Sequence, residues 1–401
     1  MRFCMVTTFY PPYNFGGCGT YVRALSRALV VQGHAVEVIH CLDAYRIKSK
    51  HSMPDEGSDE GIVVHQLESA FGFLSPLITQ LTGRPGIKSR ATRATFTRSF
   101  DVVHFHNISL VGGPAVMTQS KAPVNLYTLH DHWLLCPTHV FWKNNSKPCD
   151  RPTCFSCSLA SRIPPQLWRY TRLVQRSIAG VDAILAPSEN TATLHRDRGL
   201  SPPIHVLPSF SAIEPQIERT PRHDRPRFLF VGRLTASKGI VELLQEFAGL
   251  PAYDLQVVGE GELRGQLEHR FAACSNIRFL GPKPQAELAS IYQDATALIL
   301  PSLVPETFSL TIVEAFACGT PAIVRDVGGA RELIEATGGG LIYRTSEELR
   351  LLLSRVAHEP GFREALAGRA RGGFLRLYTP ERHVKNYLAL VDSIRVAKGL
   401  S

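Results

Sequence analysis

The stretch PSLVPETFSLTIVEAFACGTPAIVRDVGGARELI, residues 301–334, decides the fold of this 401-residue chain. The four residues before it, Ala297–Leu300, are all apolar, as in a strand that is buried on both faces of a parallel sheet. From Thr307 onward the apolar residues follow a helical period, which Gly319 ends. Ala322–Val324 reads as the next buried strand. A strand, a helix and a strand in this order predict a doubly wound α/β fold.

Two carboxylates stand out in this stretch. Glu306 lies in the loop before the predicted helix, and Glu314 lies about two turns inside it. Ligands bind at the carboxyl edge of parallel sheets, so both side chains can face one crevice. The amide groups of Phe308, Ser309 and Leu310 at the helix start suit a phosphate, and a carboxylate within the helix suits a ribose diol. The stretch therefore predicts a cradle for a nucleotide sugar.

The segment PETFSLTIVEAFACGTPAIVRDVGGARELI closely resembles the E-x7-E segment of the retaining, family-four type glycosyltransferases of the GT-B fold. The resemblance implies two Rossmann-like, doubly wound domains that face a cleft, with the nucleotide sugar held mainly by the second domain. It implies that Glu306 contacts the donor sugar and that Glu314 contacts the ribose. One position departs from the family pattern, because Ser309 stands where Gly is frequent, and this bears on the identity of the donor.

Strands and helices alternate along the rest of the chain as well, which predicts two α/β domains. We expect an acceptor-binding domain over residues 1–207, with a Cys-rich insert at about 136–157. Residues 208–226 lose periodicity and gain proline and charge, which predicts an interdomain linker. A donor-binding domain follows over residues 227–378. The resemblance implies that a C-terminal helix over residues 379–401 crosses back to the first domain.

A pair of cations begins the second domain. Gly232 ends the apolar run of residues 227–231, and Arg233 and Lys238 follow it in GRLTASKGI. Two cations in a strand-to-helix loop can neutralise a diphosphate leaving group. The segment is similar to the Gly-Arg-Leu…Lys-Gly motif of the same family, which implies this role for both side chains. The alternative is a solvated pair of loop residues.

In the first domain, Gly16 and Gly17 lie in a glycine-rich loop between a strand and a helix. Such a loop lets the backbone approach the donor phosphates or the acceptor. Glycines in a strand-to-helix turn are structural at least as often as functional. The resembled family has a Gly-Gly pair here, which favours the functional reading.

A histidine ends another predicted strand of the first domain. His130, in TLHDHW, can hydrogen-bond a sugar hydroxyl or take up a proton near neutral pH. The resemblance places the corresponding histidine beside the donor sugar, with Asp131 as a neighbour. The alternatives are a satisfied core histidine and a capping aspartate. Among the other histidines, His106 is the best candidate for a group on the acceptor side.

Four of the nine cysteines fall within 22 residues, with the spacing C-x12-C-x4-C-x2-C. They are Cys136, Cys149, Cys154 and Cys157. Thiolates bind zinc tetrahedrally, and cysteines of a reducing compartment rarely pair as disulfides. A structural zinc site that shapes the acceptor side is therefore the favoured prediction. A segment without metal and an iron–sulfur cluster are the alternatives.

Composition and charge limit the compartment and the partners. The chain has no run of about 18 apolar residues, and its N-terminus lacks the features of a secretory signal, so we expect a cytoplasmic protein. Residues 1–205 carry 21 Lys and Arg against 13 Asp and Glu, whereas residues 206–401 carry 23 against 22. The basic half could face anionic lipid headgroups at the inner face of the membrane, or a lipid-diphosphate acceptor. The alternative is a solvated basic face. No nucleic-acid-binding motif is present, and nucleic acid is not an expected partner.

The function predicted from these features is a retaining transfer of a sugar from a nucleotide diphosphate sugar to a hydroxyl acceptor. The acceptor would be lipid-linked, a saccharide or a small molecule. The sequence has no Asp-x-Asp metal motif, so no catalytic cofactor is expected. Two alternatives stay open. The first is a GT-B sugar-nucleotide epimerase or phosphorylase, and the second is a zinc-bearing binding protein without catalytic activity.

Overall fold

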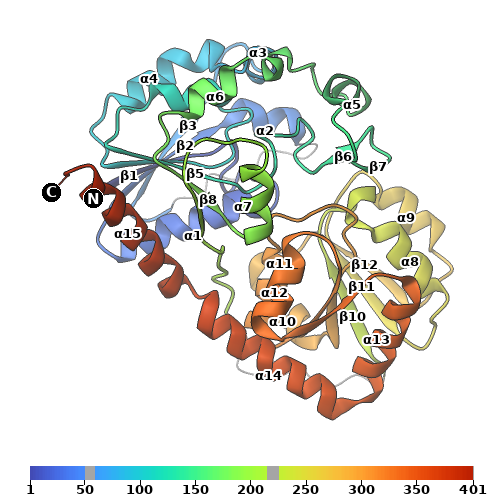
Figure 1. Cartoon of the computed structure of the whole chain (residues 1–401). Helices are drawn as coiled ribbons and strands as arrows, with labels where there is room; N and C mark the ends of the chain where they lie inside the picture. The colour runs from blue at the N-terminus through green and yellow to red at the C-terminus, as the bar shows by residue number, and fades with distance from the viewer. Residues whose placement is uncertain (50–58, 215–224, 401) are drawn as a thin grey trace. The chain divides into compact units, whose positions relative to one another are not determined.

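The structure, a computed structural model, describes residues 1–49, 59–214 and 225–400 (Figure 1). The chain divides into two compact units, and each is described by itself. The N-terminal unit comprises residues 1–144, 150–209 and 380–401, and the C-terminal unit comprises residues 145–149 and 210–379. Of the predicted linker, residues 215–224 lie outside the described residues.

The sheet of the N-terminal unit is entirely parallel. Its described strands follow the order β3-β2-β1-β4-β5-β8-β9. Most residues of the inner strands are buried and apolar, because helices cover both faces of such a sheet. The strand bounds are β1 Arg2–Val6, β2 Ala35–Cys41, β3 Ile62–Leu67, β4 Val102–Phe105, β5 Val124–Thr128, β8 Ala183–Ala186 and β9 Ile204–Val206.

Helices α1 and α15 lie together against this sheet, and α3, α4 and α6 lie on its other side (Figure 1). Side-chain hydrogen bonds tie α15 to the rest of the unit. Tyr21 Oη lies 2.8 Å from His383 Nε2, and Tyr387 Oη lies 3.1 Å from His104 Nδ1. The bounds are α1 Gly17–Val31, α2 Leu42–Lys48, α3 Leu74–Thr82, α4 Ser89–Phe96, α5 Cys154–Ala160, α6 Leu173–Ile178, α7 Glu189–Arg196 and α15 Pro380–Ala397, with 3-10 turns η1 Gly86–Lys88, η2 Pro114–Gln119 and η3 Leu167–Tyr170 and the short strand β6 Trp142–Lys143. The short strand β7 Lys147–Pro148 falls in the residues assigned to the C-terminal unit.

The C-terminal unit is a second parallel sheet, whose described strands follow the order β12-β11-β10-β13-β14-β15. One apolar core packs under α8, α9 and α13, and another packs under α10, α11, α12 and α14, so both faces are covered. The bounds are β10 Arg227–Val231, η4 Ala236–Lys238, α8 Ile240–Ala248, β11 Asp254–Val258, α9 Arg264–Arg270, β12 Ile277–Gly281, α10 Gln285–Asp294, β13 Ala297–Leu300, α11 Leu310–Ala317, β14 Ala322–Arg325, α12 Gly329–Thr337, β15 Gly340–Tyr343, α13 Ser346–His358 and α14 Pro360–Leu377.

Both units are thus α/β structures with parallel sheets, as the alternating pattern predicts. The helix expected from Thr307 begins later, at Leu310. None of the described helices is long and apolar enough to cross a lipid bilayer.

Candidate active site

Glu306 and Lys238 meet at the carboxyl edge of the C-terminal sheet. Glu306 lies in the loop between β13 and α11, and Lys238 lies at the end of η4, which follows β10. Lys238 Nζ lies 2.5 Å from Glu306 Oε1, and Ser302 Oγ donates a 2.6 Å hydrogen bond to the same oxygen. Burial opposes ionisation of Glu306, but Lys238 and Ser302 outweigh burial, so the pKa of Glu306 lies below its ordinary value. The carboxylate is therefore charged and held in place.

The backbone at Glu306 is fixed by a glycine. Gly328, just before α12, forms a parallel bridge with Glu306, and Gly329 N donates a 2.9 Å hydrogen bond to Glu306 O. Gly328 has a φ of 66°, and a Cβ there would lie 2.6 Å from Pro305 Cα. Only glycine combines this left-handed backbone with such a close approach. The turn at Gly328 and Gly329 therefore positions the Glu306 loop.

Glu314 is partly buried on α11 and is held by a tyrosine. Tyr292 Oη, from the end of α10, donates a 2.8 Å hydrogen bond to Glu314 Oε2. Thr320 Oγ1 in turn donates a 2.6 Å bond to Tyr292 O. Burial raises the pKa of Glu314 to about 7, although the hydrogen bond from Tyr292 acts in the opposite direction. Glu314 therefore changes its charge in the physiological pH range.

Arg233 and Gly232 lie in the same loop as Lys238. The Arg233 side chain is exposed, and its charge contributes to the lowered pKa of Glu306. Gly232 N donates a 3.0 Å hydrogen bond to Val258 O. Gly259 packs so closely beneath the loop that a Cβ there would lie 1.9 Å from Gly232 O. The structure thus brings both predicted cations and Glu306 into one neighbourhood.

The three residues predicted to bind phosphate lie at the start of α11. Ser309 is the N-cap residue and has extended backbone angles, Leu310 is the first helical residue, and Phe308 precedes both. Ser309 Oγ lies 2.9 Å from Thr311 Oγ1 and makes no capping bond to the helix backbone. The first amides of α11 are orphan donors of the kind that bind an anion.

In the N-terminal unit, His130 follows β5 and His106 follows the neighbouring strand β4. His106 Nδ1 lies 2.9 Å from His130 Nε2. The ring of Tyr21, from α1, packs against His130 with its centroid 4.9 Å away. Burial lowers the pKa of His130 to about 4, so the imidazole is neutral at physiological pH. His106 is completely buried, so it serves as the partner of His130 within this unit.

Asp131 is a structural neighbour of His130. Its carboxylate accepts hydrogen bonds from Asn107 Nδ2 at 3.0 Å, from His139 Nδ1 at 2.8 Å and from Trp133 N at 2.9 Å. Burial opposes its ionisation, but His139 and the amide of Trp133 prevail, and the pKa of Asp131 falls to about 2. This carboxylate caps the turn that follows His130.

Gly16 and Gly17 are exposed at the start of α1. Gly16 has a φ of 80° and a Cβ there would meet open space, so its backbone conformation, and not crowding, favours glycine. Asn14 Nδ2 donates a 2.9 Å hydrogen bond to Gly16 O and fixes the loop. The pair lies at the carboxyl edge of β1, where a ligand can approach the backbone.

The predicted zinc site is not supported by the structure. Among the described residues, no group of three or more His, Cys, Asp or Glu could hold a metal ion. Two of the four thiols, Cys136 and Cys157, are buried in other contacts, with Cys136 Sγ 3.2 Å from Thr138 Oγ1 and Cys157 Sγ 3.6 Å from Trp142 O. Cys149 and Cys154 are partly exposed. These contacts fit the alternative of a segment without metal, in which the thiols of Cys136 and Cys157 pack against neighbouring groups.

The sequence analysis assigned none of the supporting contacts at the site. Ser302 and Gly328 hold Glu306, Tyr292 holds Glu314, and His106, the best candidate for an acceptor-side group, lies against His130. The alternation of strands places His106 and His130 at the ends of adjacent parallel strands, which is a signal that could have paired them. The partners of the two glutamates depend on loop geometry that no periodicity reveals.

Comparison with known proteins follows the same division of the chain. The family described as Glycosyltransferase Family 4 matches residues 15–210, and the family described as Glycosyl transferases group 1 matches residues 213–372. An uncharacterized glycosyltransferase of Methanocaldococcus jannaschii is 31% identical over 421 residues, covering 94% of this chain and 95% of that protein.

Two solved structures share the fold. A sucrose-phosphate synthase from Thermosynechococcus elongatus has a TM-score of 0.77 at 18% identity and covers 99% of each chain. HepE of Anabaena, solved in complex with UDP and glucose, has a TM-score of 0.68 at 16% identity, over 98% of this chain and 100% of that one. This chain belongs to the family-four type glycosyltransferases of the GT-B fold.

Proposed function

We propose that this protein is a retaining hexosyltransferase that moves a sugar from a nucleotide diphosphate sugar to a hydroxyl acceptor. The observation that carries the proposal is the charged cluster of Lys238 and Glu306, beside Arg233, at the carboxyl edge of the C-terminal sheet. Two cations can neutralise the charge of a diphosphate, and the carboxylate can accept hydrogen bonds from the hydroxyls of a sugar. A simple binding protein has no need for this combination.

The cations and the helix start act on the leaving group. In the reaction the bond between the sugar anomeric carbon and the diphosphate oxygen breaks, and a bond to the acceptor oxygen forms on the same face. The acceptor proton passes to the departing diphosphate. Arg233, Lys238 and the first amides of α11 stabilise the charge that develops on that oxygen, an effect that is typically worth several kcal/mol. Retention of configuration rests on the family alone.

The carboxylates position the donor. Glu306 accepts hydrogen bonds from sugar hydroxyls while Ser302 keeps its orientation. Glu314 accepts from the ribose diol when it is ionised. His130, which is neutral, hydrogen-bonds the donor sugar and is not required to carry a positive charge. Each role is an interaction that a neutral or truncated substitute would weaken.

A UDP-sugar is the first donor to test, because HepE, which has a similar fold, was solved in complex with UDP and glucose. The acceptor classes that fit the family are lipid-linked sugars, saccharides and small molecules, in the synthesis of polysaccharides, glycolipids or glycosylated metabolites. No catalytic metal is included in the proposal, because the chain lacks an Asp-x-Asp motif.

Release of the nucleotide diphosphate from UDP-, GDP-, ADP- and TDP-sugars tests the proposal. We expect the wild type to release one nucleotide and Arg233→Ala to lose that activity. Arg270→Ala changes an exposed arginine elsewhere in the same unit and is the matched control. Chromatography of the sugar product separates transfer from epimerisation and phosphorolysis. No release and no donor binding by calorimetry would overturn the donor site.

A further inference from the structure

Helix α3 of the N-terminal unit exposes its apolar face. Leu74, Leu77, Ile78 and Leu81 are spaced i, i+3, i+4 and i+7, which places them on one side of the helix. In a water-soluble protein such a stripe normally faces the core. Here the buried residues of α3 are instead Ser75, Pro76 and Thr79, while Leu74 and Leu81 are exposed and the two between them are partly exposed.

Buried hydrogen bonds fix this orientation. Lys88 is almost fully buried and donates a 2.8 Å hydrogen bond from Nζ to Ser75 Oγ. At the other end of the helix, Trp168 Nε1 donates a 2.7 Å bond to Gln80 O. Turning α3 to bury its leucines would leave the Lys88 ammonium without this acceptor in the interior, at a cost in free energy. The outward apolar face is therefore a built feature of the fold.

More exposed apolar side chains lie on segments next to α3. Phe71 and Phe73, just before α3, are 59% and 62% exposed. The 3-10 turn η3 packs against α3 and includes Leu167 and Tyr170, which are 60% and 66% exposed. We define the α3 surface by its exposed apolar residues Phe71, Phe73, Leu74, Leu81, Leu167 and Tyr170. Large apolar patches of this kind mark interaction sites.

The two segments that form the α3 surface contain no acidic residue. Residues 69–100 carry five Lys or Arg and residues 151–180 carry five Arg, and neither segment has an Asp or Glu. The helices and turns of these segments, α3, η1, α4, η3 and α6, pack on one another. Exposed arginines that form no salt bridge with a described residue are Arg84, Arg90, Arg93, Arg162, Arg172 and Arg176.

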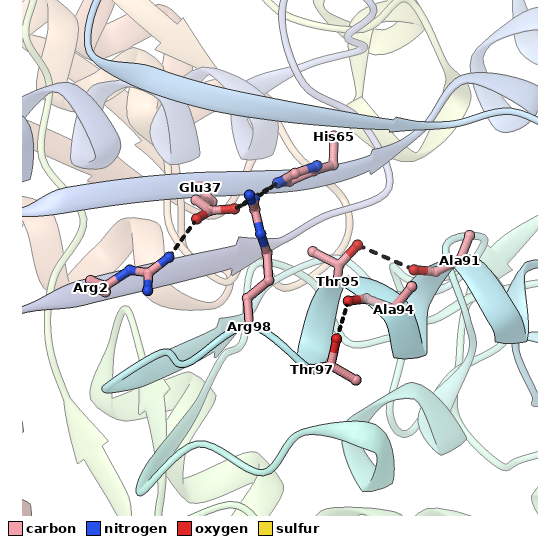
Figure 2. Close-up of polar contacts among 8 residues, drawn as sticks. All are labelled: Arg2, Glu37, His65, Ala91, Ala94, Thr95, Thr97 and Arg98. Carbon is pink, nitrogen blue, oxygen red and sulfur yellow. Dashed lines mark hydrogen bonds and ion pairs between the residues drawn. The ribbon is translucent and has the colours of Figure 1, made fainter.

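Arg98 is different, because it is used within the fold. Together with Arg2 it pairs with Glu37, and His65 Nε2 lies 2.7 Å from Glu37 Oε2 (Figure 2). Two threonines at this end of the helix bond to the backbone, with Thr95 donating to the carbonyl group of Ala91 and Thr97 to that of Ala94 (Figure 2). The six exposed arginines named above form no such ion pair with a described residue.

We propose that the α3 surface docks on the surface of an anionic lipid bilayer, with its apolar side chains at the acyl boundary and the six arginines at the headgroups. Apolar side chains that are flanked by unpaired cations are the signature of interfacial binding. A second copy of the chain would bring the same cations face to face, which is repulsive. Nucleic acid would match the arginines but leaves the leucines without a partner.

Sedimentation of the full-length protein with vesicles tests this proposal. We expect binding to phosphatidylcholine vesicles that contain 30% phosphatidylglycerol, and binding about tenfold weaker to phosphatidylcholine alone. The variant Phe73→Ser with Leu81→Ser and the variant Arg90→Glu with Arg93→Glu should each weaken binding by at least about tenfold. Release of nucleotide diphosphate from a soluble donor should stay unchanged in both.

Matched variants control for lost apolar area and lost charge. Leu351→Ser with Val396→Ser removes exposed apolar side chains outside the α3 surface, and Lys121→Glu with Lys385→Glu reverses exposed charges outside the two basic segments. Both should bind vesicles with little change. If they weaken binding as much as the test variants do, or if wild type does not bind anionic vesicles, the proposal is overturned.

Depth of insertion separates lipid contact from attraction by charge alone. Brominated acyl chains should quench the fluorescence of Leu81→Trp, relative to the background from the native tryptophans, and should not quench Val396→Trp. Equal quenching of the two would overturn the placement of α3 in the bilayer. Sedimentation velocity measures self-association, and a titration with single-stranded RNA measures nucleic-acid binding. If the wild type does not bind vesicles, and Phe73→Ser with Leu81→Ser loses self-association or RNA binding, the partner of the α3 surface is a second copy or RNA and not a bilayer.

Discussion

Lys238 and Glu306 form an ion pair in which Nζ and Oε1 lie 2.5 Å apart, and their side chains are only 18% and 13% exposed. Lys238→Met keeps the length of the side chain and removes its charge. We expect nucleotide diphosphate release to slow by about a hundredfold, because one stabilising charge on the leaving group is lost. Glu306 then lacks its main partner, and stability falls by about 3 kcal/mol. Rates at saturating donor and a urea unfolding curve measure the two effects separately.

Restoring the charge balance distinguishes these effects. Adding Glu306→Gln to Lys238→Met removes the unpaired carboxylate and should recover most of the lost stability, whereas the rate should stay low. If the double variant recovers the rate, Lys238 acts only as a support for Glu306.

Donor binding should depend on the protonation of Glu314. Burial raises the pKa of this group to about 7, so it becomes neutral as the pH falls below 7. A protonated carboxyl accepts fewer hydrogen bonds from the ribose diol, and we expect donor affinity to fall about tenfold between pH 8 and pH 6. Glu314→Gln should remove this pH step. A step that is unchanged in Glu314→Gln belongs to another group.

The same raised pKa affects folding in the opposite direction. Between the unfolded value near 4.5 and the folded value near 7, the folded protein binds more protons than the unfolded chain does. The contribution of Glu314 to stability is therefore complete below about pH 4.5 and is lost as the pH rises toward 7. Unfolding free energies of wild type and Glu314→Gln, compared at pH 5 and pH 8, measure this term.

His106 should set the proton position on His130. Burial keeps the pKa of His106 well below its ordinary value, and its Nε2 atom has no hydrogen-bond partner among the described residues. A buried N–H without an acceptor is costlier than a bare lone pair, so the proton lies on Nδ1 and is donated to His130 Nε2. His130 then carries its own proton on Nδ1. Nitrogen-15 shifts of labelled histidine, assigned with His130→Gln, report this tautomer.

Two substitutions at His106 separate hydrogen bonding from volume. Asparagine can keep a donor near the position of Nδ1, whereas leucine cannot. We expect His106→Leu to lose about tenfold in rate and His106→Asn to recover part of it, at similar thermal stability. Equal rates for the two variants would show that the hydrogen bond is not needed.

Much of the donor site follows from sequence, because its signal is local. An apolar strand, a helical period and a glycine stop place Glu306 and Glu314 where the structure has them. The error in the start of α11 has a tertiary cause. The bridge between Glu306 and Gly328 keeps the chain extended through Ser309, and no local pattern records a contact between residues so far apart.

Two other features show what periodicity leaves out. The apolar residues of 74–81 recur at a helical period, but such a period does not indicate which side of a helix meets the core. Hydrogen bonds from Lys88 and Trp168, which lie in other segments, fix that orientation. Cysteine spacing likewise indicates possible ligands but not their arrangement. The contacts of Cys136 with Thr138 and of Cys157 with Trp142 depend on the path of the chain between them.

Gly328 offers a test of how tightly the Glu306 loop is held. Gly328→Ala places a methyl group 2.6 Å from Pro305 Cα at a φ of 66°, so the loop must move. Gly338 has the same φ of 66°, but a Cβ there would meet only the flexible Arg369 side chain, at 3.1 Å. Both alanine variants should lose about 1 kcal/mol or more of stability through backbone strain. Only Gly328→Ala should also lose donor affinity, by about tenfold or more in calorimetry, because it alone displaces Glu306. Equal affinities in the two variants would mean that the carboxylate keeps its place without the glycine contact.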